Sequence, residues 1–168
     1  GKVDGYTLFV KDAVIGDVVE VKVMKAKKNY GYARLMHILT PSEGREKEPK
    51  CVIARKCGGC QIQQMKYDWQ LRFKETKVRD SLVRIGEVPE PLLDRVMEPI
   101  QEMEEPFRYR NKAQFPIGVN RDGRLTAGFY AGRTHSIIPV KDCVLGVPVN
   151  KEILDCILDF MEEFDIPA

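Results

Sequence analysis

The sequence predicts an α+β protein in which a small β-barrel is followed by a cysteine-rich loop, a long helix and an antiparallel β-sheet. Three observations support this: runs rich in valine and aromatic residues near the start, an apolar repeat of helical period, and alternating residues in the second half. The 168 residues are 43% hydrophobic and 31% charged, which is typical of a globular protein. No apolar run reaches the roughly 20 residues of a membrane helix.

The first part of the chain is predicted to be all β. Three strand-like runs, at 6–10, 17–24 and 30–39, are separated by turns that contain lysine or glycine. They predict a small β-barrel or part of one. The polar segment 40–50, which contains two prolines and a glycine, is expected to link this barrel to the cysteines.

One long amphipathic helix is expected over about 65–86. Residues that recur there at helical spacing are Tyr67, Leu71, Lys74, Val78, Leu82 and Ile85. Gly86 and Pro89 follow at the place where a helix stop belongs. The acidic stretch 87–105 is then expected to be a linker, because it has seven acids against one arginine.

Alternating patterns return in the second half and predict a hairpin-rich antiparallel sheet. Strands are expected within 107–119, 125–130 and 135–140, with a turn at 120–123. A final helix is expected with Asn150 as its cap and with one apolar face. The members of that face are Ile153, Leu154, Ile157, Leu158 and Met161. Cys156 lies in this helix and is expected to be a packed thiol.

Four cysteines form the most informative motif. Cys51, Cys57 and Cys60 lie within ten residues, and Cys143 follows far downstream. Four thiols match the ligand count of a cuboidal iron–sulfur cluster, and the intervening Gly58–Gly59 pair lets the chain curl tightly around such a group. A tetrahedral zinc site also takes four cysteines, although zinc ribbons usually pair two short hooks. A disulfide framework fits less well, because the cysteine count is odd and no secretory signal is visible.

A cationic region follows. Between 108 and 141 the chain carries seven Lys or Arg residues and one acid. If 107–115 is a strand, Arg108, Arg110, Lys112 and Gln114 share one face, and such a row suits phosphates and RNA base edges. The alternative is a solvated sheet face with long cationic side chains over an apolar underside.

Together these stretches resemble the RNA uracil-5-methyltransferases. The resemblance lies in Cys51-x5-Cys57-Gly-Gly-Cys60 with QIQQMKYDWQLRFK, in FRYRNKAQFPIG, and in GFYAGRTHSIIPVKDC ending at Cys143. It is strongest to the branch that methylates 23S ribosomal RNA and carries a 4Fe-4S cluster. The first forty-odd residues, with LFVKDAVIGDVVEVKV, resemble most of a TRAM domain, an OB-like β-barrel.

The resemblance implies two domains, a TRAM-like barrel truncated at its N-terminus (1–45) and a central iron–sulfur and RNA-binding domain (46–168). It implies 23S ribosomal RNA as the partner, a cytoplasmic location, and neither DNA nor membrane binding. The implied cluster ligands are Cys51, Cys57, Cys60 and Cys143. It also implies RNA contact by the barrel and by the central sheet, where the candidate residues are Arg108, Arg110, Asn111, Lys112, Gln114, Arg133 and His135.

These enzymes attack uracil C6 with a cysteine thiolate and take the methyl group from S-adenosylmethionine, in a Rossmann-like domain. The sequence has no Gly-rich turn of that kind and no cysteine in a nucleophile setting. It also begins at Gly1 without methionine. We therefore expect a piece of a longer parent that binds S-adenosylmethionine elsewhere, with no catalytic residue in this chain. The alternatives are a stand-alone iron–sulfur redox or sensor protein and a zinc-bound RNA-binding module.

Overall fold

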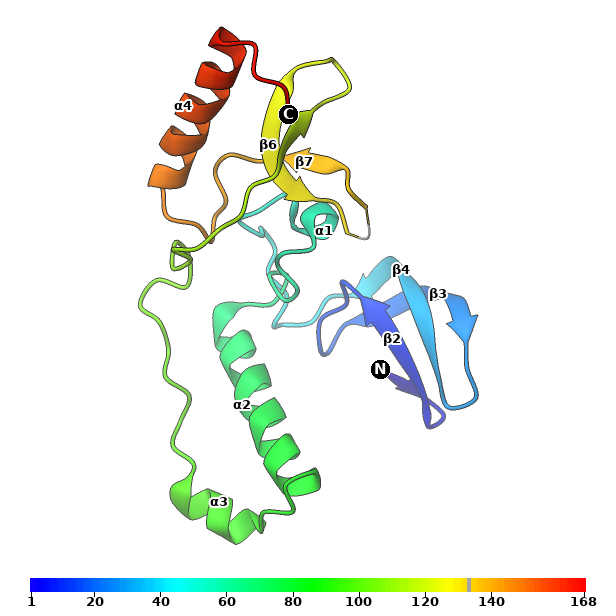
Figure 1. The fold of residues 1–168 in the computed structure, drawn as a ribbon. Helices are drawn as coiled ribbons and strands as arrows, with labels where there is room; N and C mark the ends of the chain where they lie inside the picture. Colours follow the sequence, from blue (N-terminus) through cyan, green and yellow to red (C-terminus); the bar gives the residue numbers. More distant parts are fainter. Residues whose placement is uncertain (133) are drawn as a thin grey trace. The chain divides into compact units, whose positions relative to one another are not determined.

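The computed structural model describes residues 1–132 and 134–168 (Figure 1). The chain forms two compact units, and it passes from unit 1 to unit 2 twice. Unit 1 contains Gly1–Pro49 and Ile62–Glu102, and unit 2 contains Lys50–Gln61 and Met103–Ala168. Helices and strands occur in both units, so the α+β class is confirmed. Within the described residues, no helix combines the length and apolar character needed to cross a bilayer.

Unit 1 contains a four-stranded sheet with the order β1-β2-β4-β3. The three predicted strands are confirmed, and a two-residue strand precedes them. β2 and β4 pair in parallel, whereas β3 and β4 pair antiparallel with three register shifts, which increase the local twist. Closure into a barrel stays a prediction. The strands are β1 (Lys2–Val3), β2 (Tyr6–Lys11), β3 (Val18–Ala26) and β4 (Tyr30–Thr40).

A buried ion pair fixes the loops at one end of this sheet. The Asp17 carboxylate accepts hydrogen bonds from the Val14 amide (2.6 Å), the Ser42 amide (2.9 Å) and Arg45 Nε (3.0 Å). The Asp17 side chain is 1% exposed and that of Arg45 is 14% exposed. Burial opposes ionisation, but the Arg45 guanidinium and the two amides outweigh it and lower the pKa of Asp17 to about 2.

The predicted long helix is α2 (Tyr67–Arg84). Its first turn packs through Trp69, whose ring lies so close to Gly44 that a Cβ there would come within 2.1 Å of it. The expected apolar stripe is not covered, since no α2 residue is buried and Ile85 is 82% exposed. The segment expected to be a linker contains a further helix, α3 (Glu90–Val96), which Leu93 anchors with 3% exposure.

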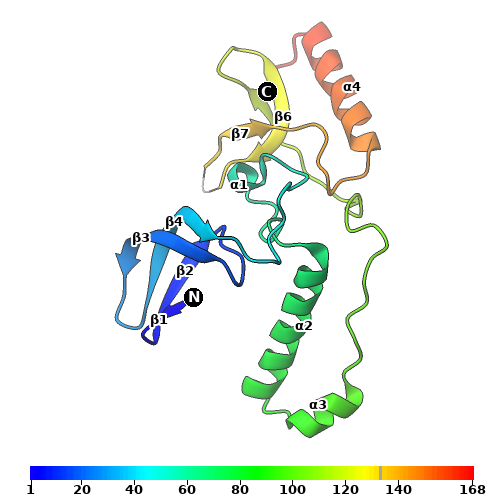
Figure 2. The ribbon, with the colours of Figure 1, turned by 180° about the vertical axis from the view of Figure 1, so that it is seen from behind.

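Unit 2 pairs a three-stranded antiparallel sheet, in the order β5-β6-β7, with helix α4 (Figures 1 and 2). Ala127 of β6 packs with Leu154 and Leu158 of α4 as the core. The predicted turn at 120–123 is confirmed, because the Asn120 side chain accepts hydrogen bonds from two amides after it. The elements are α1 (Ala54–Cys57), β5 (Ile117–Val119), β6 (Leu125–Tyr130), β7 (Ile137–Pro139) and α4 (Val149–Glu163).

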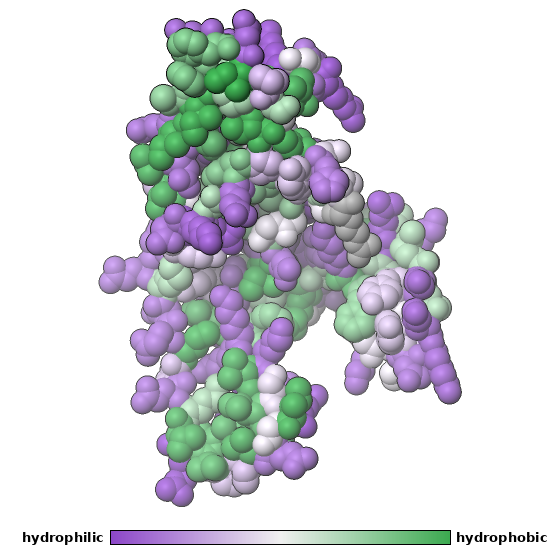
Figure 3. Space-filling view, in the orientation of Figure 1, coloured by the Kyte–Doolittle hydropathy of each residue, from purple (hydrophilic) through white to green (hydrophobic). Residues whose placement is uncertain are grey.

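Two expectations for the final helix are wrong. Asn150 is not its cap, because α4 begins at Val149 after Pro148 and the Asn150 amide already donates to Val147 O within the first turn. Cys156 is exposed rather than packed, because it lies two residues from both Leu154 and Leu158 and therefore on the opposite side of the helix from these core residues. Ile153 on the same helix is 50% exposed. Figure 3 shows hydrophobic residues gathered over the region of α4.

Replacing Asp17 with Asn should lower the free energy of unfolding by about 3 kcal/mol, because Arg45 then loses its charged partner in a buried position. The pKa of Asp17 is lowered to about 2, so this contribution is present above the ordinary carboxyl value of 3.8 and is lost as the pH falls toward 2. Urea unfolding at about pH 7 and about pH 2 should show the difference between wild type and variant shrinking in acid.

The control is Asp80→Asn, which removes an exposed pair with Arg84 and should have little effect at either pH. A stability loss for Asp17→Asn that is the same at both pH values would contradict the electrostatic account of this anchor.

Candidate functional site

Four cysteines line one cavity in unit 2. Cys51, Cys57 and Cys60 come from the first segment of this unit, and Cys143 comes from the loop between β7 and α4. All four are half-buried. The cavity measures about 260 Å³. The sequence motif therefore corresponds to a place in the structure where thiols from two distant segments converge.

The local backbone shows why glycines stand between the cysteines. α1 is a single turn that ends at Cys57; the next residue, Gly58, has a φ of 70°, and its amide donates to Ala54 O at 3.0 Å. This left-handed conformation favours glycine and lets the chain reverse directly after Cys57. A Cβ at Gly59 would come within 3.3 Å of Cys57 Sγ, so a larger residue would crowd the sulfur.

Arg108 holds the turn that presents Cys143. Its guanidinium forms an ion pair with Asp142 and donates to Cys143 O at 3.0 Å and to Gly146 O at 3.3 Å. Its own amide donates to Val144 O at 3.0 Å. The same turn is closed from within, because the Gly146 amide donates to Cys143 O at 2.9 Å. Arg108 thus positions a cysteine.

Arg110 lies at the cavity itself. It is one of the lining residues, and its amide donates to Leu145 O at 2.8 Å. Burial raises the pKa of the Cys60 thiol, the neighbouring thiols raise it further, and Arg110 opposes this rise. Four thiols in such mutual range favour a bound group that shares their negative charge once they ionise.

The site has room for more than a single metal ion. Within residues 1–132 and 134–168, no three His, Cys, Asp or Glu side chains come close enough to hold one ion. Zinc binds thiolates at about 2.3 Å, which requires sulfurs about 4 Å apart. The four cysteines share the lining of their cavity with ten other residues, and the cavity is several times larger than the roughly 30 Å³ of one water molecule in the liquid. In the described residues, the sulfurs therefore do not form a ready-made tetrahedral zinc site.

The rest of the cavity wall is mostly apolar. An apolar wall limits the access of water to whatever the thiols hold, which tunes and protects a metal site. Phe129 also stacks on Phe115 at 4.8 Å, which connects the wall to the sheet core. The apolar and aromatic members of the wall are Ile53, Ala54, Phe129, Tyr130, Val140, Val144 and Leu145.

The predicted cationic row does not form. Residues 107–116 lie outside the strands, and Arg108 has a φ of 55°, so alternate residues do not share a face. Arg108 donates to Cys143 O, and Arg110 lines the cysteine cavity. Asn111, Lys112 and Gln114 are exposed, and His135 is an exposed residue that packs edge-on against Tyr130 at 5.5 Å. Arg133 lies outside the described residues.

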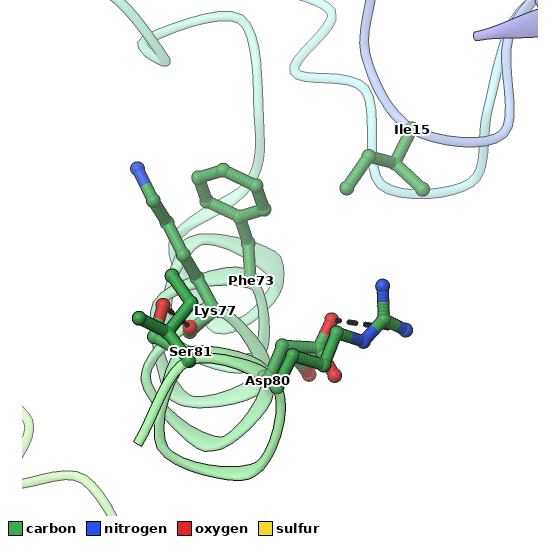
Figure 4. Close-up of a pocket in the computed structure, with 8 residues that line it drawn as sticks. Ile15, Phe73, Lys77, Asp80 and Ser81 are labelled. Carbon is green, nitrogen blue, oxygen red and sulfur yellow. Dashed lines mark hydrogen bonds and ion pairs between the residues drawn. The ribbon is translucent and has the colours of Figure 1, made fainter. Parts of the chain in front are cut away.

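A second hollow lies in unit 1, between Ile15 and one face of α2 (Figure 4). Its polar groups are used locally, since Ser81 donates to Lys77 O at 2.8 Å and Asp80 pairs with Arg84. Phe73 contributes a half-buried ring. This hollow therefore lacks the convergent reactive groups that distinguish the cysteine cavity.

The sequence missed the roles of both arginines. The sequence holds a weak signal for Arg108. Asp142 stands directly before Cys143, and Arg108 is an opposite charge at the start of the 107–116 segment. Their pairing across 34 residues nevertheless depends on the tertiary fold.

Comparison with known proteins agrees with the sequence motifs. Residues 1–36 match the TRAM domain family. Over 166 residues the chain is 43% identical to a protein of Clostridium tetani named as an uncharacterised RNA methyltransferase, which covers 99% of this chain and 35% of that protein. A protein of the same description from Listeria monocytogenes is 47% identical over 150 residues, or 86% of this chain and 30% of that protein.

The chain thus spans about a third of the length of the curated relatives that it matches. A solved structure has a similar fold, with a TM-score of 0.57 and 23% identity over 95% of this chain and 33% of that one. It is the tRNA (uracil-54, C5)-methyltransferase of Pyrococcus abyssi in complex with S-adenosyl-L-homocysteine. The comparisons relate the whole chain to part of longer proteins named RNA methyltransferases.

Replacing Arg108 with Ala should lower the thermal midpoint, because the turn at Cys143 loses both its ion pair and its hydrogen bonds to two carbonyls. Lys112→Ala, which removes a neighbouring exposed cation, is the matched control and should leave the midpoint unchanged. Calorimetry of both variants checks this. Equal midpoints for wild type and Arg108→Ala would remove the positioning role.

Proposed function

We propose that this chain is the RNA-recognition and cluster-binding part of an S-adenosylmethionine-dependent RNA uracil-5-methyltransferase. The observation that carries the proposal is the convergence of Cys51, Cys57, Cys60 and Cys143 on one cavity. The TRAM match, the names of the relatives and the fold of the solved uracil methyltransferase support it. The cysteine pattern favours the 23S ribosomal RNA branch, in which a 4Fe-4S cluster accompanies the same spacing.

The four cysteines would hold the cluster, and Arg110 would contribute positive charge beside it. When bound, a 4Fe-4S cluster can serve either as an electron carrier or as a structural tie. Methyl transfer from S-adenosylmethionine moves no net electron, so the structural role fits this function. It would join the segment around α1 to the Cys143 turn, which lies more than eighty residues further along the chain.

The methyl transfer itself belongs to the remaining length of the relatives in this proposal. A uracil-5-methyltransferase needs a thiolate nucleophile and a site for S-adenosylmethionine. Four of the five cysteines line the cavity, and Cys156 lies on an exposed, acidic stretch of α4 between Asp155 and Asp159. The contribution of this chain would be to hold the RNA while a base is turned out of its stack.

Oxygen-free preparations of the chain should be brown and contain iron and sulfide in a ratio near four of each per chain. Replacing Cys57 or Cys143 with Ala should remove the colour and lower the thermal midpoint sharply, because the tie between the two segments is lost. Cys156→Ala is the control and should alter neither. Colourless protein that binds one zinc and folds normally would instead support the zinc-bound module.

The chain should also bind a 23S ribosomal RNA stem-loop more tightly than DNA of the same sequence. Contacts to the 2′-hydroxyl distinguish the two, whereas phosphate contacts alone would not. Fluorescence anisotropy over a range of salt concentrations measures both the affinity and the number of phosphates contacted. A chain that carries its cluster, undergoes reversible reduction and has no RNA affinity would favour the redox or sensor reading.

A further inference from the structure

Three aromatic rings form a cluster on the sheet of unit 1. Phe9 on β2 is paired in register with Tyr32 on β4, and Tyr30 lies two residues before Tyr32 on the same strand. The ring centroids are 5.6 Å apart for Phe9 and Tyr32, and 5.8 Å apart for each of these rings and Tyr30. We call the surface formed by Phe9, Tyr30 and Tyr32 the aromatic face.

The aromatic face lies on the solvent-exposed side of the sheet. Phe9 is 54% exposed and Tyr32 is 47% exposed, whereas Ala33, the next residue along β4, is buried at 7%. Successive residues of a strand point to opposite sides, so the rings lie on the uncovered side. Tyr30 stands nearly perpendicular to both other rings, at 81° and 87°, and braces them from one side.

Cations border the aromatic face. Lys25 of β3 is paired with Tyr32 of β4, and Lys22 is paired with Arg34. All three cationic side chains are exposed, and the described part of the chain shows no ion pair for any of them. From 18 to 34 the sequence has five Lys or Arg residues and one acid, Glu20. The face is therefore aromatic at its centre and positive around it.

The turn between β3 and β4, which contains Lys27 and Lys28, is fixed by hydrogen bonds to Tyr6. The Tyr6 hydroxyl lies 2.5 Å from Tyr30 O and 2.7 Å from Lys27 O, and it accepts from the Lys27 amide at 3.1 Å. The Lys27 amide also donates to Tyr30 O at 2.8 Å. These bonds connect the β3–β4 turn to β2, so the backbone of the two strands that carry Lys25 and Tyr32 is fixed next to β2 before any ligand binds.

We propose that the aromatic face binds unpaired nucleotides of an RNA strand, whose bases stack on Phe9 and Tyr32 while Lys22, Lys25 and Arg34 contact the phosphates. Every base has a π-face, so this mode tolerates different sequences and requires a single strand. The site rests on the proposed RNA function and specifies where that function lies. An apolar protein partner fits less well, because the positive border complements a polyanion.

The test uses the full 168-residue chain, purified without oxygen, and a labelled oligouridine of about twelve nucleotides. Phe9→Leu and Tyr32→Leu keep an apolar surface but remove the π-face, and each should weaken binding about tenfold. Tyr32→Phe should bind like the wild type, because it keeps the ring. Phe160→Leu is the matched control, since Phe160 is 53% exposed and packs on Phe164 in the other unit.

The cations provide a second, independent measurement. Lys25→Gln should weaken binding and reduce the slope of log affinity against log salt by about 0.7, the value for one phosphate on a single strand. The same oligonucleotide annealed to its complement should bind more weakly, because paired bases cannot stack on the rings. The unfolding midpoint of each variant is measured beside its affinity, so that a loss of binding can be distinguished from a loss of folded protein.

The outcomes separate the two proposals. If the wild type binds RNA and the two Leu variants bind equally well, the aromatic face is overturned while the RNA function stands. If the wild type binds no single-stranded or structured RNA, both are overturned. If the Leu variants lose thermal stability and Tyr32→Phe binds no better than Tyr32→Leu, the rings are packing groups beneath another polypeptide segment or protein partner, which also overturns the stacking site.

Discussion

The cysteine cavity of unit 2 lies where thiols from two segments far apart in the chain converge. The only helix of the first segment, α1, is four residues long, and a helix of one turn has no stability of its own. Its contacts include the Gly132 amide, 3.5 Å from Lys56 O, and Lys50, which lies over the Phe107 ring at 4.0 Å and 4.0 Å from Glu105. A group held by all four cysteines would add a direct connection between this segment and the Cys143 turn, and Arg110 would offset part of its negative charge.

Two of the cationic residues predicted to contact RNA, Arg108 and Arg110, lie at the cysteine site and not on the face of a strand. Arg108 and Arg110 run beside the loop that follows Cys143 and are engaged by its carbonyl oxygens through side chain or backbone. A positive charge beside a thiolate cluster is stabilising, whereas the same charge on an RNA-facing strand would be solvated. Arg108 and Arg110 therefore contribute their charge at the cysteine site, whereas Lys22, Lys25 and Arg34 of unit 1 are exposed beside aromatic rings.

The spacing of apolar residues predicted the strands of unit 1 and its long helix. β2, β3, β4 and α2 were all placed within about two residues, and the cysteine set was identified from its spacing and the glycine pair. The strand prediction for residues 107–116 was wrong. Charged and aromatic residues alternate there as they do in a strand, but Arg108 has a left-handed backbone conformation and pairs with Asp142. Helix α3 was not predicted, because the many acidic residues of 87–105 are typical of a linker. Its buried residue, Leu93, gives no helical repeat by itself.

The aromatic face shows how a candidate binding surface can be absent from the sequence and present in the fold. Phe9 and Tyr32 each lie in a strand-like run where a ring is ordinarily a core residue. They become neighbours only because β2 and β4 pair in parallel, which places residues 23 apart in the chain side by side on the uncovered side of the sheet. Strand pairing of this kind is set by the connection between strands and not by local pattern. Exposure of the paired rings, more than their chemistry alone, is therefore what distinguishes a stacking surface from a core.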